Sequence, residues 1–258
     1  MKNLTKMILG AAGLAGMALS AAPAFAQDAP ASPWAITANV AVTNDYRFRG
    51  ISQSDRDPAP QGSVTVSGPE GFYVSAWASR VDFDPTNVGN PYVELDIYGG
   101  KHTDLWGVDW NLMPYYYAYP AQNYPGAPQA DYFELINQLT KAFGPVTLQA
   151  TYAYSPSFTF RTGEGNYLAG MASYTINDWL SISGNVGHQW VENARLVGSR
   201  DYTWGDIGVT ATWKGIALDL RYSGTDLNGP QCAAFYMTTT SACKGGFVAS
   251  VNYTFTLL

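Results

Sequence analysis

The chain has 258 residues and a formal net charge of −6, and only 13% of its residues are charged. This acidic balance excludes a nucleic-acid-binding protein that works through a basic surface, because clustered lysine and arginine bind the phosphate backbone. Beyond the N-terminal segment there is no run of about 18 apolar residues, so the mature chain cannot cross a membrane as helices.

The first 26 residues predict a cleaved secretory signal peptide. Lys2 and Lys6 form a positive region, residues 7–19 an apolar core, and an Ala-Phe-Ala cleavage site ends at Ala26. A retained membrane helix is disfavoured because this core is too short for a bilayer of ~30 Å. Cleavage would leave residues 27–258 as a single mature domain, which the strand pattern that follows predicts to be an outer-membrane β-barrel.

The first predicted strand starts at Trp34 and reads WAITANVAVT, with apolar residues at every second position. This period of two is typical of a strand with one apolar and one polar face. If the alternation continues to a loop at Gly50, Tyr46 and Phe48 join the apolar face. The polar face then carries three charges: Asp45, Arg47 and Arg49. Charges inside a long alternating strand need a wet interior, which favours a membrane β-barrel.

Eleven further strands follow by the same alternation, separated by glycine, proline and asparagine turns. Their expected ranges are 61–67, 72–81, 92–101, 107–119, 131–143, 146–154, 166–176, 179–191, 202–214, 216–223 and a last strand after Gly245. The fourth and fifth are joined by a turn near 102–106, and the parity of the eighth is left open. Short turns alternate with long loops, which predicts a closed, all-β antiparallel barrel of about 12 strands, with periplasmic turns and extracellular loops.

The polar faces of these strands place seven acidic and three basic residues inside the barrel. They are Asp45, Arg47, Arg49, Glu94, Asp96, Asp109, Glu134, Asp206, Asp219 and Arg221. Barrels of about eight strands are filled by side chains and those of about sixteen hold an open channel, so twelve strands predict a narrow pore. We expect passive diffusion of small hydrophilic solutes, with cations or neutral molecules favoured by the net acidic lumen.

Three other interpretations stay open. The inward charges can neutralise one another and plug the lumen. The chain can be a structural or adhesive barrel with recognition loops, such as the acidic stretch from Asp55 to Asp57. It can also be an outer-membrane lipid hydrolase, which needs a serine beside His188. Ser181 and Ser183 have the opposite parity to that histidine, so the residues favour a protein that is not an enzyme.

Other residues predict local features. Cys232 and Cys243 lie in the last long loop of an exported chain and are expected to form a disulfide. With no histidine near them, neither a metal site nor a cofactor is predicted. Four tyrosines at the end of the fifth strand predict an interfacial girdle: Tyr115, Tyr116, Tyr117 and Tyr119.

Several runs of the sequence resemble the TorF family, proteobacterial outer-membrane barrels classed as porins. They include NDYRFRGISQS at 44–54, GFY at 71–73, WAS at 77–79 and ELDIYGG at 94–100. The resemblance implies a β-barrel in the outer membrane of a Gram-negative bacterium and a porin role without a named substrate. The expected partners are outer-membrane lipids and small polar solutes, not nucleic acid, and self-association into a homo-oligomer is left open.

Overall fold

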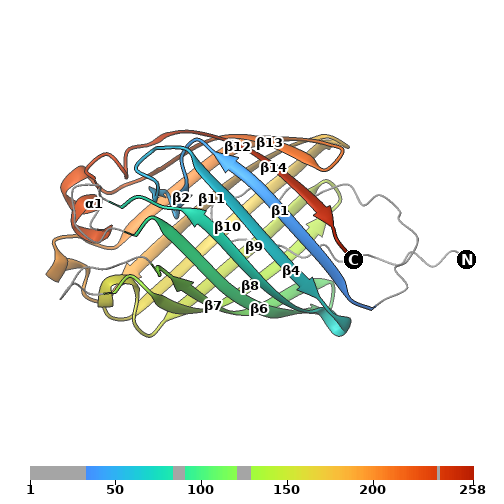
Figure 1. Ribbon diagram of the computed structural model, residues 1–258, viewed down its shortest axis with the longest axis horizontal. Coiled ribbons are helices and arrows are strands. Elements are labelled where there is room, and N and C mark those ends of the chain that lie inside the picture. The colour runs from blue at the N-terminus through green and yellow to red at the C-terminus, as the bar shows by residue number, and fades with distance from the viewer. Residues whose placement is uncertain (1–32, 84–90, 121–128, 237–238) are drawn as a thin grey trace, which may run out of the picture.

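The computed structural model describes residues 33–83, 91–120, 129–236 and 239–258. Twelve long strands form one closed antiparallel barrel (Figure 1). They are β1 (Ala35–Thr43), β4 (Ala59–Ser67), β5 (Phe72–Arg80), β6 (Val93–Leu105), β7 (Val108–Ala118), β8 (Tyr132–Phe143), β9 (Val146–Ser155), β10 (Gly165–Asn177), β11 (Leu180–Val191), β12 (Tyr202–Trp213), β13 (Ile216–Thr225) and β14 (Gly246–Thr256). The predicted fold class and number of strands are confirmed.

The first strand closes the ring. In β1, Val40 lies opposite Tyr253 of β14 on one side and Gly62 of β4 on the other. The contact continues past β14, because the backbone N–H of Ile36 donates to the carbonyl of Leu258 at 2.9 Å. Each barrel strand therefore has two neighbours, which satisfies the backbone polar groups that lipid cannot.

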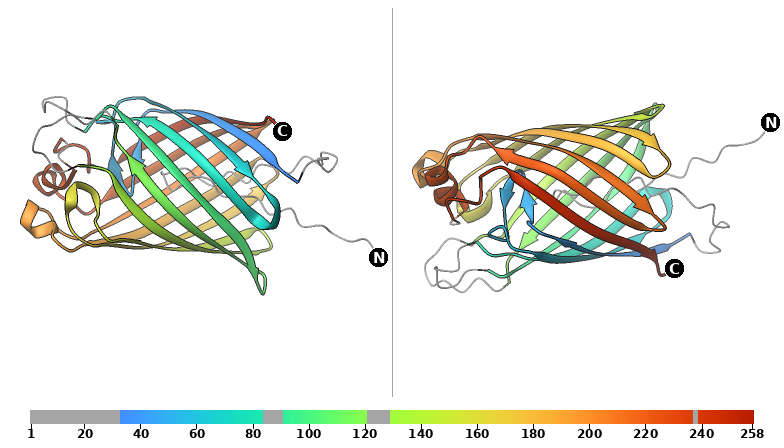
Figure 2. Two further views of the ribbon diagram at one scale, coloured as in Figure 1. Left: turned by 60° about the horizontal axis from the view of Figure 1, so that its bottom comes forward. Right: turned by 90° about the horizontal axis from the view of Figure 1, so that it is seen from above.

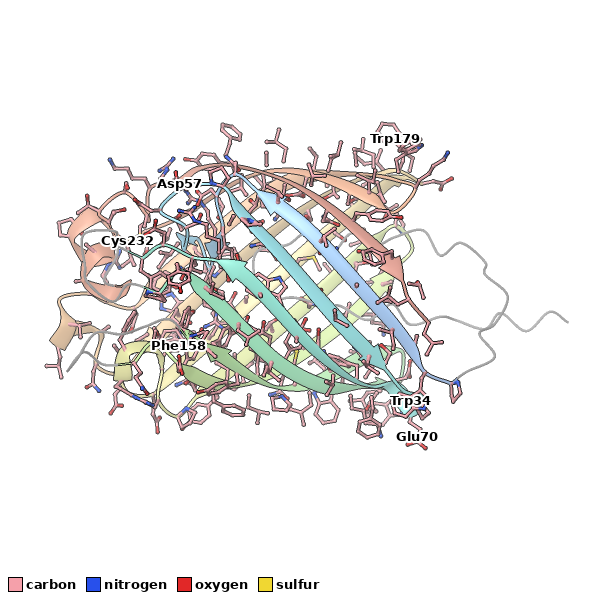
Figure 3. All side chains as sticks on the ribbon, viewed as in Figure 1. Trp34, Asp57, Glu70, Phe158, Trp179 and Cys232 are labelled. Atoms are coloured by element: carbon pink, nitrogen blue, oxygen red, sulfur yellow. A yellow bond between two sulfur atoms is a disulfide. The ribbon has the colours of Figure 1, made fainter. Side chains whose placement is uncertain are left out.

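Apolar side chains cover the outside of the barrel. In β1, Val40 and Val42 are about half exposed, whereas Ala41 and Thr43 beside them are buried. Figure 3 shows the outward side chains projecting along the whole length of the barrel. In β10, whose parity the sequence does not determine, Leu168 faces out and Tyr167 faces in. Among the described residues, no helix is long and apolar enough to cross a membrane.

The five short turns lie at one end of the barrel, together with the C-terminus and the start of β1, and we call this the turn end (Figure 1). Between β6 and β7 the turn is only Trp106 and Gly107, both with positive φ, as in the mirror-image turns that join hairpins. The prediction of a turn over 102–106 is wrong, because the pairing of β6 with β7 continues until Leu105 lies opposite Val108. The long loops emerge at the other end, the loop end.

Exposed aromatic residues form a belt near each end of the barrel. Those nearer the turn end are Trp34, Phe72, Trp106, Phe143, Tyr174, Trp179, Trp213 and Tyr253, and those nearer the loop end are Tyr92, Tyr116, Phe133, Tyr152, Trp190, Tyr222 and Phe247. The predicted girdle of four neighbouring tyrosines is wrong for three of them. Alternation leaves Tyr116 outside, but Tyr115, Tyr117 and Tyr119 are buried inside. The predicted signal peptide, residues 1–26, lies outside the described residues.

Candidate functional site in the barrel lumen

The loop after β1 folds back into the barrel. Residues 44–58, which we call the plug hairpin, contain two short paired strands, β2 (Arg47–Phe48) and β3 (Ile51–Ser52). Figure 2 shows these strands inside the ring, toward the loop end. Every residue from Asp45 to Ser54 is buried. The hairpin therefore occupies the lumen at the loop end of the barrel (Figure 2).

The local sequence explains why the chain reverses there. Arg49 and Gly50 both have positive φ, the geometry of a two-residue hairpin turn. A Cβ atom at Gly50 would lie 2.7 Å from the Cβ of Trp204 and 2.9 Å from the carbonyl oxygen of Gly224, so only glycine fits against β12 and β13. The strain of a positive φ at Arg49 must be offset by the contacts of its side chain.

Arg49 reaches across the lumen to the opposite wall. Its guanidinium donates to both carboxylate oxygens of Glu134 in β8, at 2.9 and 2.6 Å, and to the side-chain oxygen of Gln189 in β11. The same group lies 3.8 Å from the ring centre of Tyr167. A buried guanidinium is stabilised by a bidentate ion pair with a carboxylate and by aromatic rings that pack against its flat faces.

Arg47 anchors the hairpin on the near side. Its Nε donates to Asp45 at 2.7 Å, and its terminal nitrogens donate to the backbone carbonyls of Gly50, Ser223 and Lys244 at 3.2, 3.2 and 2.9 Å. Arg47 therefore ties the plug hairpin to the end of β13 and to the last long loop.

The prediction that the first strand continues to Arg49 is wrong. The strand ends at Thr43, and Asn44 bridges to β14 by accepting from the backbone N–H of Ala249 at 2.7 Å. Tyr46 and Phe48, assigned to the lipid face, are buried in the lumen, where their rings meet those of Trp77 and Tyr117 edge-on at 5.4 and 5.6 Å. Asn44 and Asp45 are turn-favouring residues and were the available signal for this break.

A second group of charges lies on β12 and β13. Arg221 donates to both oxygens of Asp219 at 2.6 and 2.9 Å and to Asp206 at 2.8 Å. Thr210 donates its hydroxyl to Asp219 at 2.7 Å, and Asn185 donates its amide to Asp206 at 2.9 Å. All three charged side chains are buried, and together they carry one net negative charge.

The opposite wall pairs carboxylates with tyrosine hydroxyls. Tyr115 donates to Asp96 at 2.7 Å, Tyr117 to Glu134 at 3.1 Å, and Tyr119 to Glu94 at 3.0 Å. Burial, followed by the nearby charge of Glu94, raises the pKa of the Tyr119 hydroxyl well above its usual range, so this group stays a donor.

Neither Glu94 nor Asp96 forms a salt bridge among the described residues, and Asp96 Oδ1 has no hydrogen-bond partner there. This wall therefore carries two carboxylates without a matching cation. Asp109 lies farther toward the turn end, where its carboxylate meets His102 Nδ1 at 2.9 Å.

A partly open cavity lies between the plug hairpin and the wall of β12, β13 and β14. Six of the ten predicted lumen residues line it: Asp45, Arg47, Arg49, Asp206, Asp219 and Arg221. Glu134 meets this group through Arg49. Glu94 and Asp96 lie on β6, and Asp109 stands apart at the turn end.

Sequence reasoning missed the stacked tyrosines that line the lumen. Tyr98 and Tyr115 stack at 4.5 Å, and Tyr117 and Tyr132 stack at 4.3 Å. The signal was present, because Asp109 and Asn111 were placed inside and the same parity in β7 leads to Tyr115 and Tyr117. The contact between His102 and Asp109 was not predicted either, because His102 was expected in a turn.

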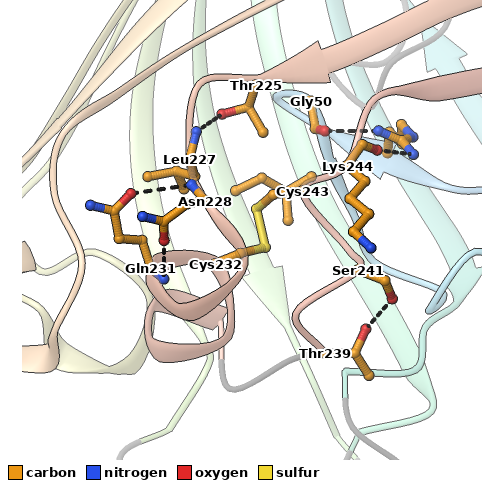
Figure 4. Close-up of a disulfide and its surroundings, with 12 residues drawn as sticks. Gly50, Thr225, Leu227, Asn228, Gln231, Cys232, Thr239, Ser241, Cys243 and Lys244 are labelled. Carbon is orange, nitrogen blue, oxygen red and sulfur yellow. Dashed lines mark hydrogen bonds between the residues drawn. A yellow bond between two sulfur atoms is a disulfide. The ribbon is translucent and has the colours of Figure 1, made fainter.

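The last long loop carries the predicted disulfide, which is present between Cys232 and Cys243 (Figure 4). Cys232 belongs to a short helix, α1 (Gly229–Tyr236), at the loop end. His188 contacts Thr203 and Trp190, and no contact joins it to Ser181 or Ser183 within the described residues. The described part of the chain also holds no group of three or more His, Cys, Asp or Glu residues placed to bind a metal ion.

Comparison with known proteins agrees with this architecture. A model of the family described as "Bacterial protein of unknown function (Gcw_chp)" matches residues 27–255. The fold is similar to the KdgM porin in complex with disordered oligogalacturonate, at 8% identity and a TM-score of 0.55, covering 86% of this chain and 99% of that one. It is also similar to the NanC porin, at 10% identity and a TM-score of 0.53, covering 86% of this chain and 100% of that one.

No curated protein matches the sequence. At such low identities the two porins show the fold alone, and the resemblance to the TorF family stays a prediction.

Proposed function

Because the chain belongs to the Gcw_chp family and folds as a porin-like barrel, we propose that it is a channel for passive diffusion of small hydrophilic solutes across the outer membrane of a Gram-negative bacterium. One observation carries this proposal: an apolar outer surface surrounds a lumen whose described walls bear charged and polar side chains. Residues 1–26 would direct export as a cleaved signal peptide.

The plug hairpin sets the narrowest part of the proposed path. It is held by side chains from β8 and β11 on one side and by backbone groups of β13 and the last loop on the other. A solute must therefore pass between the plug hairpin and the barrel wall, or it must displace the hairpin. The proposed solutes are small for this reason.

The charges along this path favour cations and neutral molecules. Arg49 is matched by Glu134, and Arg221 by two aspartates, which leaves Glu94 and Asp96 without a cation. Carboxylates that line a narrow passage attract cations and repel anions when they are ionised. Oligogalacturonate, the ligand named for the KdgM porin, is a polyanion. We expect the acidic lumen of this chain to disfavour such a solute.

A second candidate function rests on the same hairpin. Because the plug fills the loop end of the lumen and most charges are paired, the barrel can instead be closed, with a structural or adhesive role for its loops. Under this alternative, the folded protein carries no current even when the plug hairpin no longer fills the lumen.

Planar-bilayer recording distinguishes the two. We expect the wild type to give small steps of current above leak. A variant in which residues 46–53 are replaced by a glycine-serine linker should give larger steps. In a salt gradient, the reversal potential should show cation preference, which should fall in Glu94→Gln/Asp96→Asn.

The matched control is Asp178→Asn, which removes an exposed acid in the short turn between β10 and β11 and should leave the preference unchanged. If the linker variant folds but carries no current, the channel function is wrong.

A further inference from the structure

The plug hairpin is gripped from the loop end by one short segment of the last loop. The carbonyl of Ala242 accepts from the backbone N–H of Ser52 in β3 at 3.0 Å, and the carbonyl of Lys244 accepts from Arg47 in β2 at 2.9 Å. Thr239 donates its hydroxyl to Asp55 at 2.5 Å. Residues 239–244, which we call the latch, therefore bond to both strands of the hairpin and to the turn that follows them.

The disulfide lies in the middle of this latch. Cys243 stands between the two residues whose carbonyls hold the hairpin, and it is bonded to Cys232 in α1 (Figure 4). Cys232, Ala242 and Cys243 are all buried. Any displacement of the latch away from the hairpin must therefore pull on the covalent link to α1.

The helix end of this link is itself fixed to the barrel rim. Asn228 and Gln231 form reciprocal side-chain to backbone hydrogen bonds at 3.0 and 3.2 Å, which close the first turn of α1. Arg200, from the preceding loop, donates to Gln231 at 3.4 Å and to the carbonyl of Asp226 at 2.7 Å. The disulfide thus connects the latch to an anchored element rather than to a free loop.

We propose that the Cys232–Cys243 disulfide holds the latch against the plug hairpin, and that breaking it lets the hairpin leave the lumen and opens the channel. A disulfide restricts the alternative conformations of the loop that it closes. Without it, the latch gains freedom, and its hydrogen bonds must compete with water. The proposal rests on the proposed channel function and adds to it a redox-sensitive latch.

Opening requires a reductant. A dithiol transfers two hydrogen atoms to the disulfide, so that Cys232 and Cys243 become thiols and the dithiol becomes a cyclic disulfide. Because both cysteines are buried, we expect slow reduction, with completion followed by thiol labelling. The reverse reaction with an external disulfide would close the latch again.

Single-channel recording tests the latch in the folded protein. We compare wild type before and after dithiol treatment from the side of the long loops, Cys232→Ser/Cys243→Ser, and the linker variant that lacks residues 46–53. We expect a several-fold rise in conductance on reduction, the same rise in the serine variant, and no response of the serine or linker variants to dithiol. Reduction of the wild type, already folded in the bilayer, covers the case in which the serine variant does not fold.

The outcomes separate the latch from the channel. The linker variant can conduct strongly while fully reduced wild type and the serine variant conduct like untreated protein. In that case the proposed role of the disulfide is wrong, and the proposed channel function is supported. A rise in the serine variant without a rise in fully reduced wild type also overturns the latch. If no folded variant conducts, the proposed channel function is wrong, and the proposed role of the disulfide is wrong with it.

Discussion

The guanidinium of Arg49 lies 2.6 Å from the carboxylate of Glu134, a residue 85 positions away on the far side of the lumen. This ion pair joins the turn of the plug hairpin to β8, and both side chains are almost fully buried. The hairpin is also held by Arg47 on β13 and by the latch, so the ion pair is one of several contacts that determine where the plug hairpin lies.

Removing one partner of this pair should loosen the hairpin. Breaking a buried ion pair on one side leaves an uncompensated charge, which costs about 3–5 kcal/mol. We expect Arg49→Ala and Glu134→Ala each to speed hydrogen exchange at the backbone N–H of Ser52, measured by mass spectrometry in detergent micelles. Glu70→Ala, in an exposed short turn, is the control. Exchange at the wild-type rate in both variants would mean that the pair does not hold the plug.

The ring of Phe48 should also be needed to seat the hairpin. It is buried against Tyr117, and loss of a buried phenylalanine side chain costs about 3–5 kcal/mol. We therefore expect Phe48→Ala to expose Arg47 and Arg49 to trypsin, with new cleavage sites read by mass spectrometry, while Phe48→Leu stays largely protected. Protection of both arginines in the alanine variant would contradict the role of this packing.

An arginine at an outward position in the middle of a strand should weaken the barrel. Gly170 lies near the centre of β10, and a Cβ atom there would meet nothing within 4 Å, so steric conflict is absent. A lipid-facing arginine near the bilayer midplane costs about 2–4 kcal/mol. We expect that loss for Gly170→Arg and none for Gly170→Leu, measured by urea unfolding in phospholipid vesicles. Equal stability of the two variants would place this face outside lipid.

The ion-pair group on β12 and β13 should depend on the absence of a side chain at Gly208. A Cβ atom there would lie 2.5 Å from the Cβ of Arg221 and 2.8 Å from the carbonyl oxygen of Leu220. We expect Gly208→Ala to displace Arg221 from Asp206 and Asp219 and to lower the free energy of unfolding by ~1–3 kcal/mol. Gly170→Ala serves as the matched control, and unfolding curves that superimpose would contradict the prediction.

The strand pattern could be predicted because alternation is a local property. In β13, Leu218, Leu220 and Tyr222 face out while Asp219 and Arg221 face in, as their parity predicts. A strand has only two faces, so a sequence that alternates apolar and polar residues determines the side on which each residue lies. The alternation of short and long connections along the chain predicts an even number of strands, with the short turns at one end and the long loops at the other.

The sequence by itself therefore determined a closed barrel of twelve strands with an apolar outside and a charged inside. Only the tertiary structure decided that residues 44–58 leave the sheet and that the stretch from Asp45 to Ser54 fills the lumen. Parity cannot distinguish an apolar side chain that faces lipid from one that packs in a plug, as Tyr46 and Phe48 show. It also cannot say which charges meet, because partners such as Arg49 and Glu134 are brought together only when the barrel closes around the hairpin.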